Sequence, residues 1–325
     1  MEKLKVLVTH PIPQVGIELL QEKFEVEIYS GPKISRKQLL SKVKQVDGLL
    51  CLLSDGIDKE LMDSAPRLKV VSNLAVGYDN IDVDYATRRG IIVTNTPGIL
   101  TDATADLAWA LLLAVCRRIV EGDQLMRSGQ FVGWDPLMLR GGDLKNKTLG
   151  ILGAGRIGTA FAERSLGWRM KILYFDKNKN SYLEKELGAR KVSLDEVLSQ
   201  SDFISLHLPL TEDTHHLINE SALRKMKPGT YLINTARGAV VEESALVKAL
   251  KEGWIAGAGL DVFENEPRIH PELARFSNVV LTPHIGSATI ETRNEMSRIA
   301  ARNLIAALEG KKPPFVVNPQ VFDKI

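Results

Sequence analysis

A glycine-rich loop set between an apolar run and a helical pattern constrains the fold of this chain more than any other feature. Residues 148–152 are typical of a buried strand, the segment GAGRIG follows directly at 153–158, and a helix is predicted over 157–166. The first glycine allows a tight turn, the second lets a pyrophosphate approach the backbone, and the third lets the helix pack closely on the strand. The helix N-terminus adds N–H donors and partial positive charge. The loop therefore predicts an α/β domain that binds a dinucleotide.

The rest of the chain continues the same alternation of apolar runs and amphipathic stretches. This is the pattern of parallel sheets covered by helices. Before the glycine loop we predict strands and intervening helices over residues 5–8, 13–23, 25–28, 36–44, 48–52, 69–73 and 91–93. This first unit contains no glycine fingerprint, so we do not expect it to hold the dinucleotide.

Long helical patterns lie on both sides of the second unit. Residues 101–118 place apolar and small side chains on one face, and Gly141-Gly142 then breaks the chain before a second strand–helix series that runs to 284. The last helix, predicted over 289–309, has Met296 and Leu304 on one apolar face. Because it follows the second series, we expect it to pack back on the first unit.

Composition excludes several classes of function. The chain has 325 residues, enough for two domains, and its net charge of +2 comes from 42 basic and 40 acidic residues. This balance gives no reason to expect nucleic acid or an anionic membrane as a partner. The apolar runs are much shorter than the roughly 20 residues that span a bilayer, and the N-terminus lacks the features of a signal peptide. We therefore expect a cytoplasmic protein.

Cysteines and histidines give no case for a metal site. Cys51 and Cys116 both lie in apolar runs and are expected to be reduced core residues. The pair His215-His216 lacks a third ligand at suitable spacing, so we interpret it as a solvated helix start.

Three reactive side chains lie at or near the ends of successive apolar runs in the second unit. They are Arg237, Glu266 and His284. A guanidinium presents a planar fork that matches a carboxylate. An imidazole can give a proton to a forming alkoxide, and a neighbouring carboxylate favours its charged form. With a dinucleotide loop upstream, the set indicates redox chemistry on a carbonyl that lies beside a carboxylate.

An acid after the second strand of this unit favours one form of the dinucleotide. The strand predicted over 171–175 ends in Asp176, roughly 20 residues after the glycine loop, where a carboxylate suits the ribose hydroxyls of NAD and repels a 2′-phosphate. Lys177 and Lys179 lie close by and leave NADP open. His207, beside Pro209, follows the strand predicted over 203–206 and either lines the cofactor or only caps that strand.

These residues together resemble the NAD(P)-dependent D-2-hydroxyacid dehydrogenases over nearly the whole chain. The matching segments are NLAVGYDNID at 73–82, the glycine loop, NTARG at 234–238, GLDVF at 259–263 with Glu266-Pro267, and PHIGS at 283–287. The segment GWDPLM at 133–138 is most similar to the glyoxylate/hydroxypyruvate reductase branch.

The resemblance implies an architecture. It predicts an α/β protein of two Rossmann-like domains with parallel sheets, in which a cofactor domain, 100–286, is inserted into a discontinuous flavodoxin-like substrate domain, 1–99 and 287–325. It also predicts a homodimer joined through the cofactor domains. In the glyoxylate reductase branch a tryptophan matching Trp134 reaches the partner's active site, whereas the sequence alone indicates an interface aromatic there.

The resemblance also assigns roles to particular residues. His284 would be the acid/base, oriented by Glu266, and Arg237 with the backbone around Val76 and Gly77 would hold the substrate carboxylate. The side chains expected to limit substrate size are Leu53, Ser54 and Trp134. The residues expected to contact the cofactor are Thr104, Gly153, Gly155, Arg156, Ile157, Gly158, Asp176, His207, Pro209, Thr214, Thr235, Ala236, Arg237, Asp261, His284 and Gly286.

The implied activity is NAD(P)H-dependent reduction of glyoxylate or hydroxypyruvate to the D-2-hydroxy acid, with NAD(H) as the preferred cofactor. Two alternatives remain open. One is reduction of larger 2-oxoacids such as 2-ketogluconate. The other is a non-catalytic NAD-sensing protein, like the transcriptional corepressors that share this fold.

Overall fold

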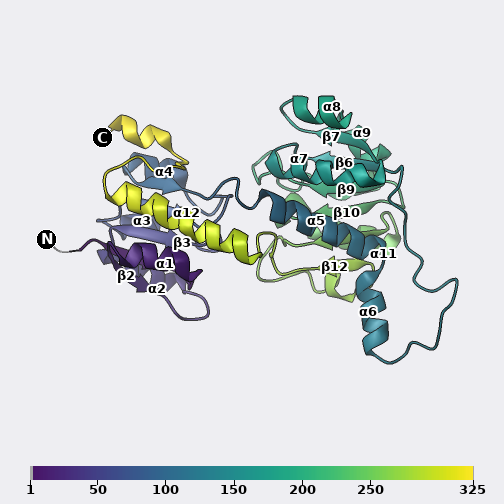
Figure 1. The fold of residues 1–325 in the computed structure, drawn as a ribbon, viewed down its shortest axis with the longest axis horizontal. Helices are drawn as coiled ribbons and strands as arrows, with labels where there is room; N and C mark the ends of the chain where they lie inside the picture. The colour runs from purple at the N-terminus through teal and green to yellow at the C-terminus, as the bar shows by residue number, and fades with distance from the viewer. Residues whose placement is uncertain (1–2, 325) are drawn as a thin grey trace. The chain divides into compact units, whose positions relative to one another are not determined.

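The apolar runs of the sequence form two parallel sheets, each within its own compact unit (Figure 1). The structure is a computed structural model and describes residues 3–324. One unit comprises the chain up to Leu100 and from Ser287 onward, and the other comprises Thr101–Gly286. The predicted fold class, α/β with two Rossmann-like parallel sheets, is confirmed.

The sheet of the first unit has the strand order β2-β1-β3-β4-β5, which is the flavodoxin-like order. Its strands are β1 (Lys5–Val8), β2 (Glu25–Ile28), β3 (Gly48–Cys51), β4 (Val70–Asn73) and β5 (Ile92–Thr94). The helices of this unit are α1 (Gln14–Gln21), α2 (Arg36–Lys42), η1 (Val43–Gln45), α3 (Lys59–Asp63), α4 (Val83–Arg88), α12 (Ile290–Leu308) and η5 (Pro319–Lys324). Every residue of β3 and β4 is buried, as expected for strands covered on both faces.

Helix α12 contributes to the core of the first sheet although it lies near the end of the chain. Met296 and Leu304 share a buried apolar cluster with Val6 of β1. The Ser297 hydroxyl donates to the carbonyl of Pro13 at 2.8 Å. A Cβ atom on Gly16 would lie 2.2 Å from that hydroxyl, so α1 and α12 can approach this closely only because residue 16 is glycine.

The sheet of the second unit has the order β12-β11-β10-β9-β6-β7-β8. Counted from β6, this is the 3-2-1-4-5-6 order of doubly wound dinucleotide-binding sheets with one further strand. The strands are β6 (Thr148–Leu152), β7 (Lys171–Phe175), β8 (Arg190–Lys191), β9 (Phe203–Leu206), β10 (Tyr231–Asn234), β11 (Gly257–Leu260) and β12 (Val279–Leu281). The strand order reverses between β6 and β9, and ligands bind such sheets at the carboxyl ends of the strands near this point.

Helices cover the second sheet (Figure 1). They are α5 (Thr101–Cys116), α6 (Ile119–Arg127), α7 (Arg156–Glu163), η2 (Arg164–Trp168), α8 (Ser181–Leu187), α9 (Leu194–Gln200), α10 (Glu220–Lys225), η3 (Gly238–Val240), α11 (Glu243–Glu252) and η4 (Leu273–Arg275). The helix predicted over 101–118 ends at Cys116 because Arg118 adopts a left-handed conformation, with φ of 52°.

The structure also bears on the state of the two cysteines and on whether a helix could span a membrane. Cys51 and Cys116 are buried and unpaired, as predicted. Within residues 3–324, each helix is too short or too polar to span a bilayer.

Candidate active site

His284 lies in the loop after β12 with a strained backbone. Its φ is 54°, in the left-handed region that costs a non-glycine residue about 1–3 kcal/mol. The N–H of His284 donates to the carbonyl of Asp261 at 2.9 Å. Strain of this kind persists only where the surrounding structure enforces it.

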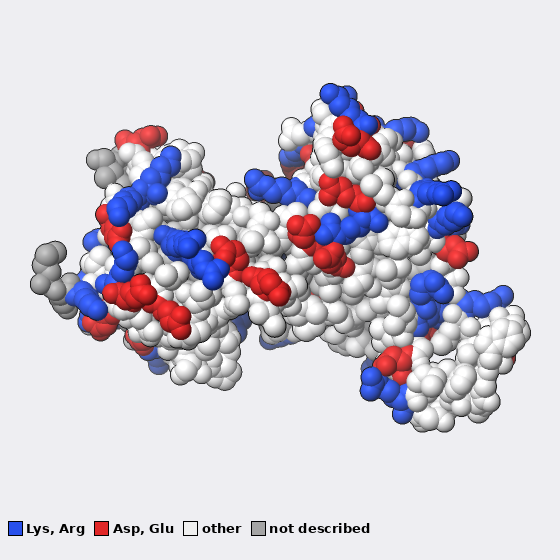
Figure 2. All heavy atoms as spheres, viewed as in Figure 1, with Lys and Arg blue, Asp and Glu red and all other residues white. Residues whose placement is uncertain are grey.

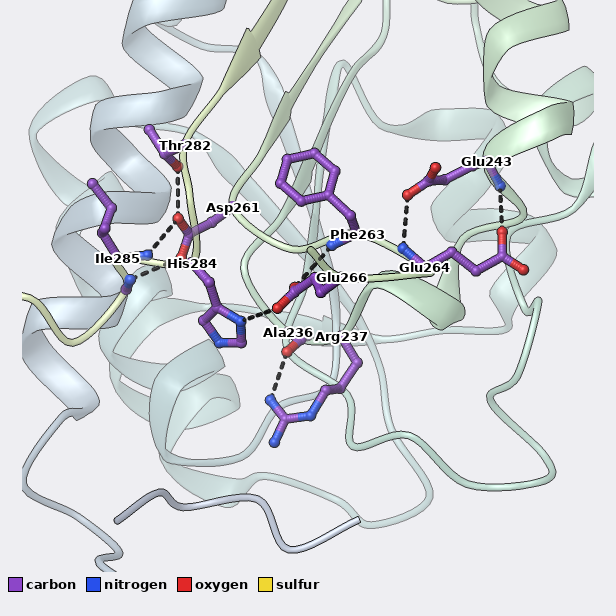
Figure 3. Close-up of polar contacts among 11 residues, drawn as sticks. Ala236, Arg237, Glu243, Asp261, Phe263, Glu264, Glu266, Thr282, His284 and Ile285 are labelled. Atoms are coloured by element: carbon purple, nitrogen blue, oxygen red, sulfur yellow. Dashed lines mark hydrogen bonds and ion pairs between the residues drawn. The ribbon is translucent and has the colours of Figure 1, made fainter. Parts of the chain in front are cut away.

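The side chain of Asp261, which follows β11, enforces this loop conformation. It is 1% exposed, and its carboxylate accepts hydrogen bonds from the Thr282 hydroxyl at 2.6 Å and from the N–H groups of Ile285 and Gly286, each at 2.8 Å. Burial raises the pKa of Asp261, although these hydrogen bonds and the charge of His284 act in the opposite direction. Asp261 was predicted to contact the cofactor, and the structure shows that it also fixes the backbone on both sides of His284 (Figure 3).

Glu266 lies against the imidazole of His284. Nδ1 of His284 and Oε2 of Glu266 are 2.9 Å apart, and Oε1 of Glu266 accepts from the N–H of Phe263 at 3.1 Å. Burial opposes ionisation of Glu266, but the hydrogen bond and charge of His284, the N–H of Phe263 and the charge of Arg237 outweigh it, so the Glu266 pKa lies below its ordinary value. Because a carboxylate only accepts hydrogen bonds, Nδ1 carries the proton of this contact, and Nε2 is the nitrogen that can face a reactant.

Arg237 follows β10 in a turn that is fixed by a buried asparagine. Asn234 is 1% exposed, its Oδ1 accepts from the N–H of Ala236 at 3.0 Å, and its Nδ2 donates to the carbonyl of Arg237 at 2.9 Å. Nη1 of Arg237 donates to the carbonyl of Ala236 at 2.8 Å. Figure 3 shows the Arg237 side chain and the His284 imidazole pointing into the same region, next to Glu266.

Gly238 lets the loop of Arg237 touch the loop of Glu266. A Cβ atom at position 238 would lie 1.8 Å from the carbonyl carbon of Phe263 and 2.4 Å from the nitrogen of Glu264. No side chain fits there without moving one of the two backbones. The close approach brings the loops of Arg237 and Glu266 together, and the hydrogen bond between Glu266 and His284 joins a third loop to them.

The glycine loop has the geometry that its sequence predicts. Gly153 has φ of 97°, and a Cβ atom on it would lie 2.7 Å from the His207 backbone. A Cβ atom on Gly158 would lie 2.0 Å from the carbonyl oxygen of Gly153, whereas one on Gly155 would meet nothing within 4 Å. The open side of Gly155 is at the N-terminus of α7, where backbone N–H groups favour a phosphate. The loop therefore fits a dinucleotide.

Asp176, at the end of β7, is joined to the glycine loop. Its Oδ2 accepts from the N–H of Ala154 and its Oδ1 from the N–H of Asn178, both at 2.8 Å. Each oxygen keeps a further lone pair for a hydroxyl group. Its position beside the loop fits the predicted contact with a ribose.

His207 follows β9 and takes a neutral form. Its Nε2 lies 2.9 Å from the Ser205 hydroxyl, and its ring centroid lies 5.0 Å from that of Phe161. Burial lowers the pKa of His207 to about 3, so the imidazole carries no charge at neutral pH. The residue as a whole keeps some exposure, and both predicted interpretations, a cofactor contact and a strand cap, agree with this geometry.

Two threonines among the predicted cofactor contacts differ in their hydrogen bonds. The Thr214 hydroxyl donates to the carbonyl of Pro209 at 2.6 Å and accepts from the N–H of Thr211 at 2.8 Å, so it holds a turn. The Thr235 hydroxyl is buried, and it has no partner in the described part of the chain. Because buried polar atoms are rarely left unpaired, this hydroxyl fits contact with a bound ligand.

The remaining residues predicted to contact the cofactor also lie in this unit. They are Thr104, Arg156, Ile157, Ala236 and Gly286.

The predicted substrate-binding residues of the first unit lie in the loops after β3 and β4. They are Leu53, Ser54, Val76 and Gly77. The side-chain amide of Asn80 donates to the carbonyls of Leu52 at 3.1 Å and Asp55 at 2.9 Å, and that of Asn73 donates to the carbonyl of Gly77 at 2.8 Å. These two amides, which sequence reasoning did not single out, hold the two loops in place.

The predicted helix start at His215-His216 was wrong. Both residues lie in a turn, and the next helix, α10, begins only at Glu220, after the side chain of Asn219 caps it. His216 is half-buried, and its Nε2 lies 2.7 Å from Oε1 of Glu264. Across residues 3–324, no three His, Cys, Asp or Glu side chains are grouped so that they could hold a metal ion.

Comparisons with known proteins add independent information. Residues 109–286 match the family model described as D-isomer specific 2-hydroxyacid dehydrogenase, NAD binding domain. A glyoxylate reductase of Thermococcus litoralis is 56% identical over 324 residues, which cover 98% of this chain and 98% of that protein.

Two solved structures are also similar. The TT0316 protein of Thermus thermophilus has a TM-score of 0.91 and 46% identity, covering 97% of this chain and 100% of that chain. An NADPH-dependent glyoxylate/hydroxypyruvate reductase of Sinorhizobium meliloti, solved in complex with NADP and malonate, has a TM-score of 0.85 and 35% identity, covering 98% of both chains.

Proposed function

Because the chain belongs to the D-isomer specific 2-hydroxyacid dehydrogenases, we propose that it reduces a small 2-oxoacid, glyoxylate or hydroxypyruvate, to the D-2-hydroxy acid. The observation that carries this proposal is the hydrogen bond between His284 and Glu266, next to Arg237, in the domain of the dinucleotide loop. This arrangement places a proton donor, His284, beside a cation that can bind a carboxylate, Arg237.

Each of the three side chains has a separate task. Arg237 binds the carboxylate of the 2-oxoacid through its guanidinium fork and polarises the neighbouring carbonyl. His284 donates the proton on Nε2 to the carbonyl oxygen as negative charge develops there. Glu266 keeps the imidazole oriented through Nδ1 and stabilises its charged form. When bound, a reduced nicotinamide supplies the hydride for the carbonyl carbon.

The two units have different tasks in this proposal. Thr101–Gly286 is the cofactor domain, since it contains the glycine loop, Asp176 and the unpaired hydroxyl of Thr235. The other unit is the substrate domain, whose backbone at Val76 and Gly77 helps to hold the carboxylate. Its loop at Leu53 and Ser54, together with Trp134, limits the size of the substrate.

Within the cofactor domain, Asp176 favours NAD over NADP, because a carboxylate repels a 2′-phosphate. The two nearby lysines are already paired with acids at the surface. Lys177 lies 2.6 Å from Asp213, and Lys179 lies 2.8 Å from Glu184. These ion pairs make the lysines less available to a 2′-phosphate.

Replacing Asp176 with alanine is expected to lower the ratio of kcat/KM with NADH to kcat/KM with NADPH by about tenfold or more, the scale of hydrogen bonds to a charged group. Steady-state rates with each cofactor at saturating glyoxylate measure this ratio. Asp195→Ala, an exposed acid on α9 that pairs with Lys225, is the control and should leave the ratio unchanged. An unchanged ratio in Asp176→Ala would show that another group selects the cofactor.

A second copy of this chain is the proposed partner. The segment 128–138 after α6 is exposed almost throughout, with Val132 at 100% and Trp134 at 82% exposure. Figure 2 shows much of the projecting region at the lower right as uncharged surface. Large apolar side chains in such a patch favour association, so we infer a homodimer through the cofactor domains. A monomer mass in light scattering would contradict this inference.

The pH profile tests the pairing of His284 with Glu266. Carbonyl reduction consumes a proton and should slow as pH rises, and Glu266→Gln, whose neutral amide cannot stabilise a charged imidazole, should change the dependence of kcat on pH. The pKa of Glu266 is lower in the folded protein than its ordinary value of about 4.3. The ionised carboxylate therefore stabilises the fold at pH values above about 4.3, and this contribution is lost as the pH falls through the lower pKa of the folded protein. The carboxylate is therefore charged throughout the assay range. Superimposable profiles of kcat against pH would count against the pair.

The proposal as a whole is tested by NADH oxidation with a panel of glyoxylate, hydroxypyruvate, pyruvate and 2-ketogluconate. We expect the highest kcat/KM with glyoxylate or hydroxypyruvate. A preference for 2-ketogluconate would favour reduction of larger 2-oxoacids. Binding of NADH without turnover of any of the four would favour a non-catalytic NAD-sensing protein.

A further inference from the structure

A buried carboxylate lies behind Glu266, outside the group that contacts the substrate in the proposed mechanism. Glu243, the first residue of α11, is 7% exposed. Its Oε1 accepts from the N–H of Glu264 at 2.7 Å, and its Oε2 accepts from the N–H of His270 at 3.0 Å. One side chain therefore ties down both ends of the loop 264–270, which carries Glu266. Figure 3 shows the contact with Glu264.

The side chain of Glu264 in turn bonds to the first turn of α11. Its Oε2 accepts from the N–H of Glu243 at 3.2 Å, and its Oε1 lies 2.7 Å from Nε2 of His216. The N-cap residue Glu242 makes no side-chain cap of its own, so the Glu264 carboxylate satisfies a backbone donor in the first turn of α11. His216 in turn holds the Glu264 carboxylate from the opposite side. Glu243 and Glu264 therefore bond to each other reciprocally, and His216 joins this network through the second oxygen of Glu264.

The network ends two residues before Glu266. Phe263, whose N–H donates to Glu266 at 3.1 Å, is held from the other side by its close backbone contact with Gly238. The backbone of 263–264 is therefore fixed by a hydrogen bond from Glu264 to the Glu243 carboxylate and by packing against Gly238. A shift of this backbone would move the Glu266 carboxylate away from Nδ1 of His284.

We propose that Glu243, Glu264 and His216 are positioning residues, which hold the loop of Glu266 so that its carboxylate meets the imidazole of His284. The proposal deepens the function proposed above and rests on it. The charged groups that act on this pair are Arg237, near Glu266, and Asp261, near His284.

Glu243→Gln cuts the network with little change in size, since an amide can accept at only one of its two ends. We expect kcat for glyoxylate reduction to fall about tenfold, the scale of a small misplacement, with KM within about twofold of the wild type. Glu266→Gln, which alters the same contact directly, should lower kcat by at least as much. Because both changes act on one contact, Glu243→Gln/Glu266→Gln should be no slower than Glu266→Gln alone. Additive losses would overturn the proposal.

A measurement that needs no turnover tests the positioning role independently of the proposed reductase activity. The Nδ1 resonance of His284, followed by NMR in protein labelled at histidine and assigned with His284→Ala, reports the hydrogen bond to Glu266 and should shift in both Glu243→Gln and Glu266→Gln relative to the wild type. A shift only in Glu266→Gln would overturn the positioning role, even if the enzyme reduces glyoxylate. A shift in both variants would support that role, even if no 2-oxoacid is reduced.

Two matched variants guard against a folding defect. Glu242→Gln makes the same change at the neighbouring residue, whose side chain accepts from Ser244 instead of the loop, and it should match the wild type in both measurements. If Glu243→Gln does not fold, His216→Leu and His216→Gln test the same positioning role at a half-buried residue. The leucine variant should shift the Nδ1 resonance of His284, and the glutamine variant, whose amide can still donate to Glu264, should restore it. Equal Nδ1 resonances in the wild type and His216→Leu would overturn the proposal.

Discussion

Replacing His284 with alanine is expected to lower kcat for glyoxylate reduction by about 10²–10⁴-fold, which is the usual contribution of a positioned general acid. The loss falls on turnover because Nε2 acts when charge develops on the carbonyl oxygen. Glu266 already occupies Nδ1, and the loop conformation is set by Asp261. Substrate affinity, which rests mainly on Arg237, should change far less. Steady-state kcat and KM with saturating NADH measure both effects.

The control for this variant is Glu186→Ala, since Glu186 is an exposed residue of α8 in the same domain. It should keep the kcat of the wild type. An unchanged kcat in His284→Ala would remove His284 from the role of acid. Retained NADH binding in His284→Ala would show that its domain is still folded.

Replacing Arg237 with alanine is expected to raise KM and lower kcat together, with a loss in kcat/KM of about 10²–10³-fold, the scale of breaking a desolvated charge pair. In the proposed mechanism the guanidinium holds the carboxylate in the ground state and polarises the carbonyl during reaction, so both constants should respond. Arg237→Lys should recover only part of the loss, because an ammonium keeps the charge but not the planar fork. Arg190→Ala, an exposed arginine of β8, is the control.

Full activity in Arg237→Lys would show that charge alone is sufficient and that no bidentate contact is made. An increase in KM with unchanged kcat in Arg237→Ala would assign Arg237 to binding only. Either result would require another group to polarise the carbonyl.

The strands were predicted from sequence with little error, for a physical reason. The strands β6 and β9 run from Thr148 to Leu152 and from Phe203 to Leu206, as the apolar runs predicted, because parallel strands in the middle of a sheet are buried on both faces. Helix ends were less accurate, since they depend on single residues. Arg118 ends one helix by a left-handed turn, and nothing in the apolar pattern indicates this.

The sequence indicated the reactive side chains but not what holds them. Gly238 appears in the sequence as one more glycine after Arg237, and its contact with Phe263 exists only in the folded chain. Glu243 has the pattern of an ordinary acid in the first turn of a helix, and only the structure shows that it is buried and binds two backbone N–H groups. His216 was misjudged for the same reason, since Glu264, its partner, is far away in sequence.

Reduction of hydroxypyruvate by NADH tests the central claim most directly, because the product shows both the reaction and its handedness. The wild-type protein is incubated with both compounds, the loss of NADH absorbance is followed, and the glycerate formed is assayed for its enantiomer. We predict stoichiometric formation of D-glycerate. L-glycerate, or no oxidation of NADH with either hydroxypyruvate or glyoxylate, would contradict the account.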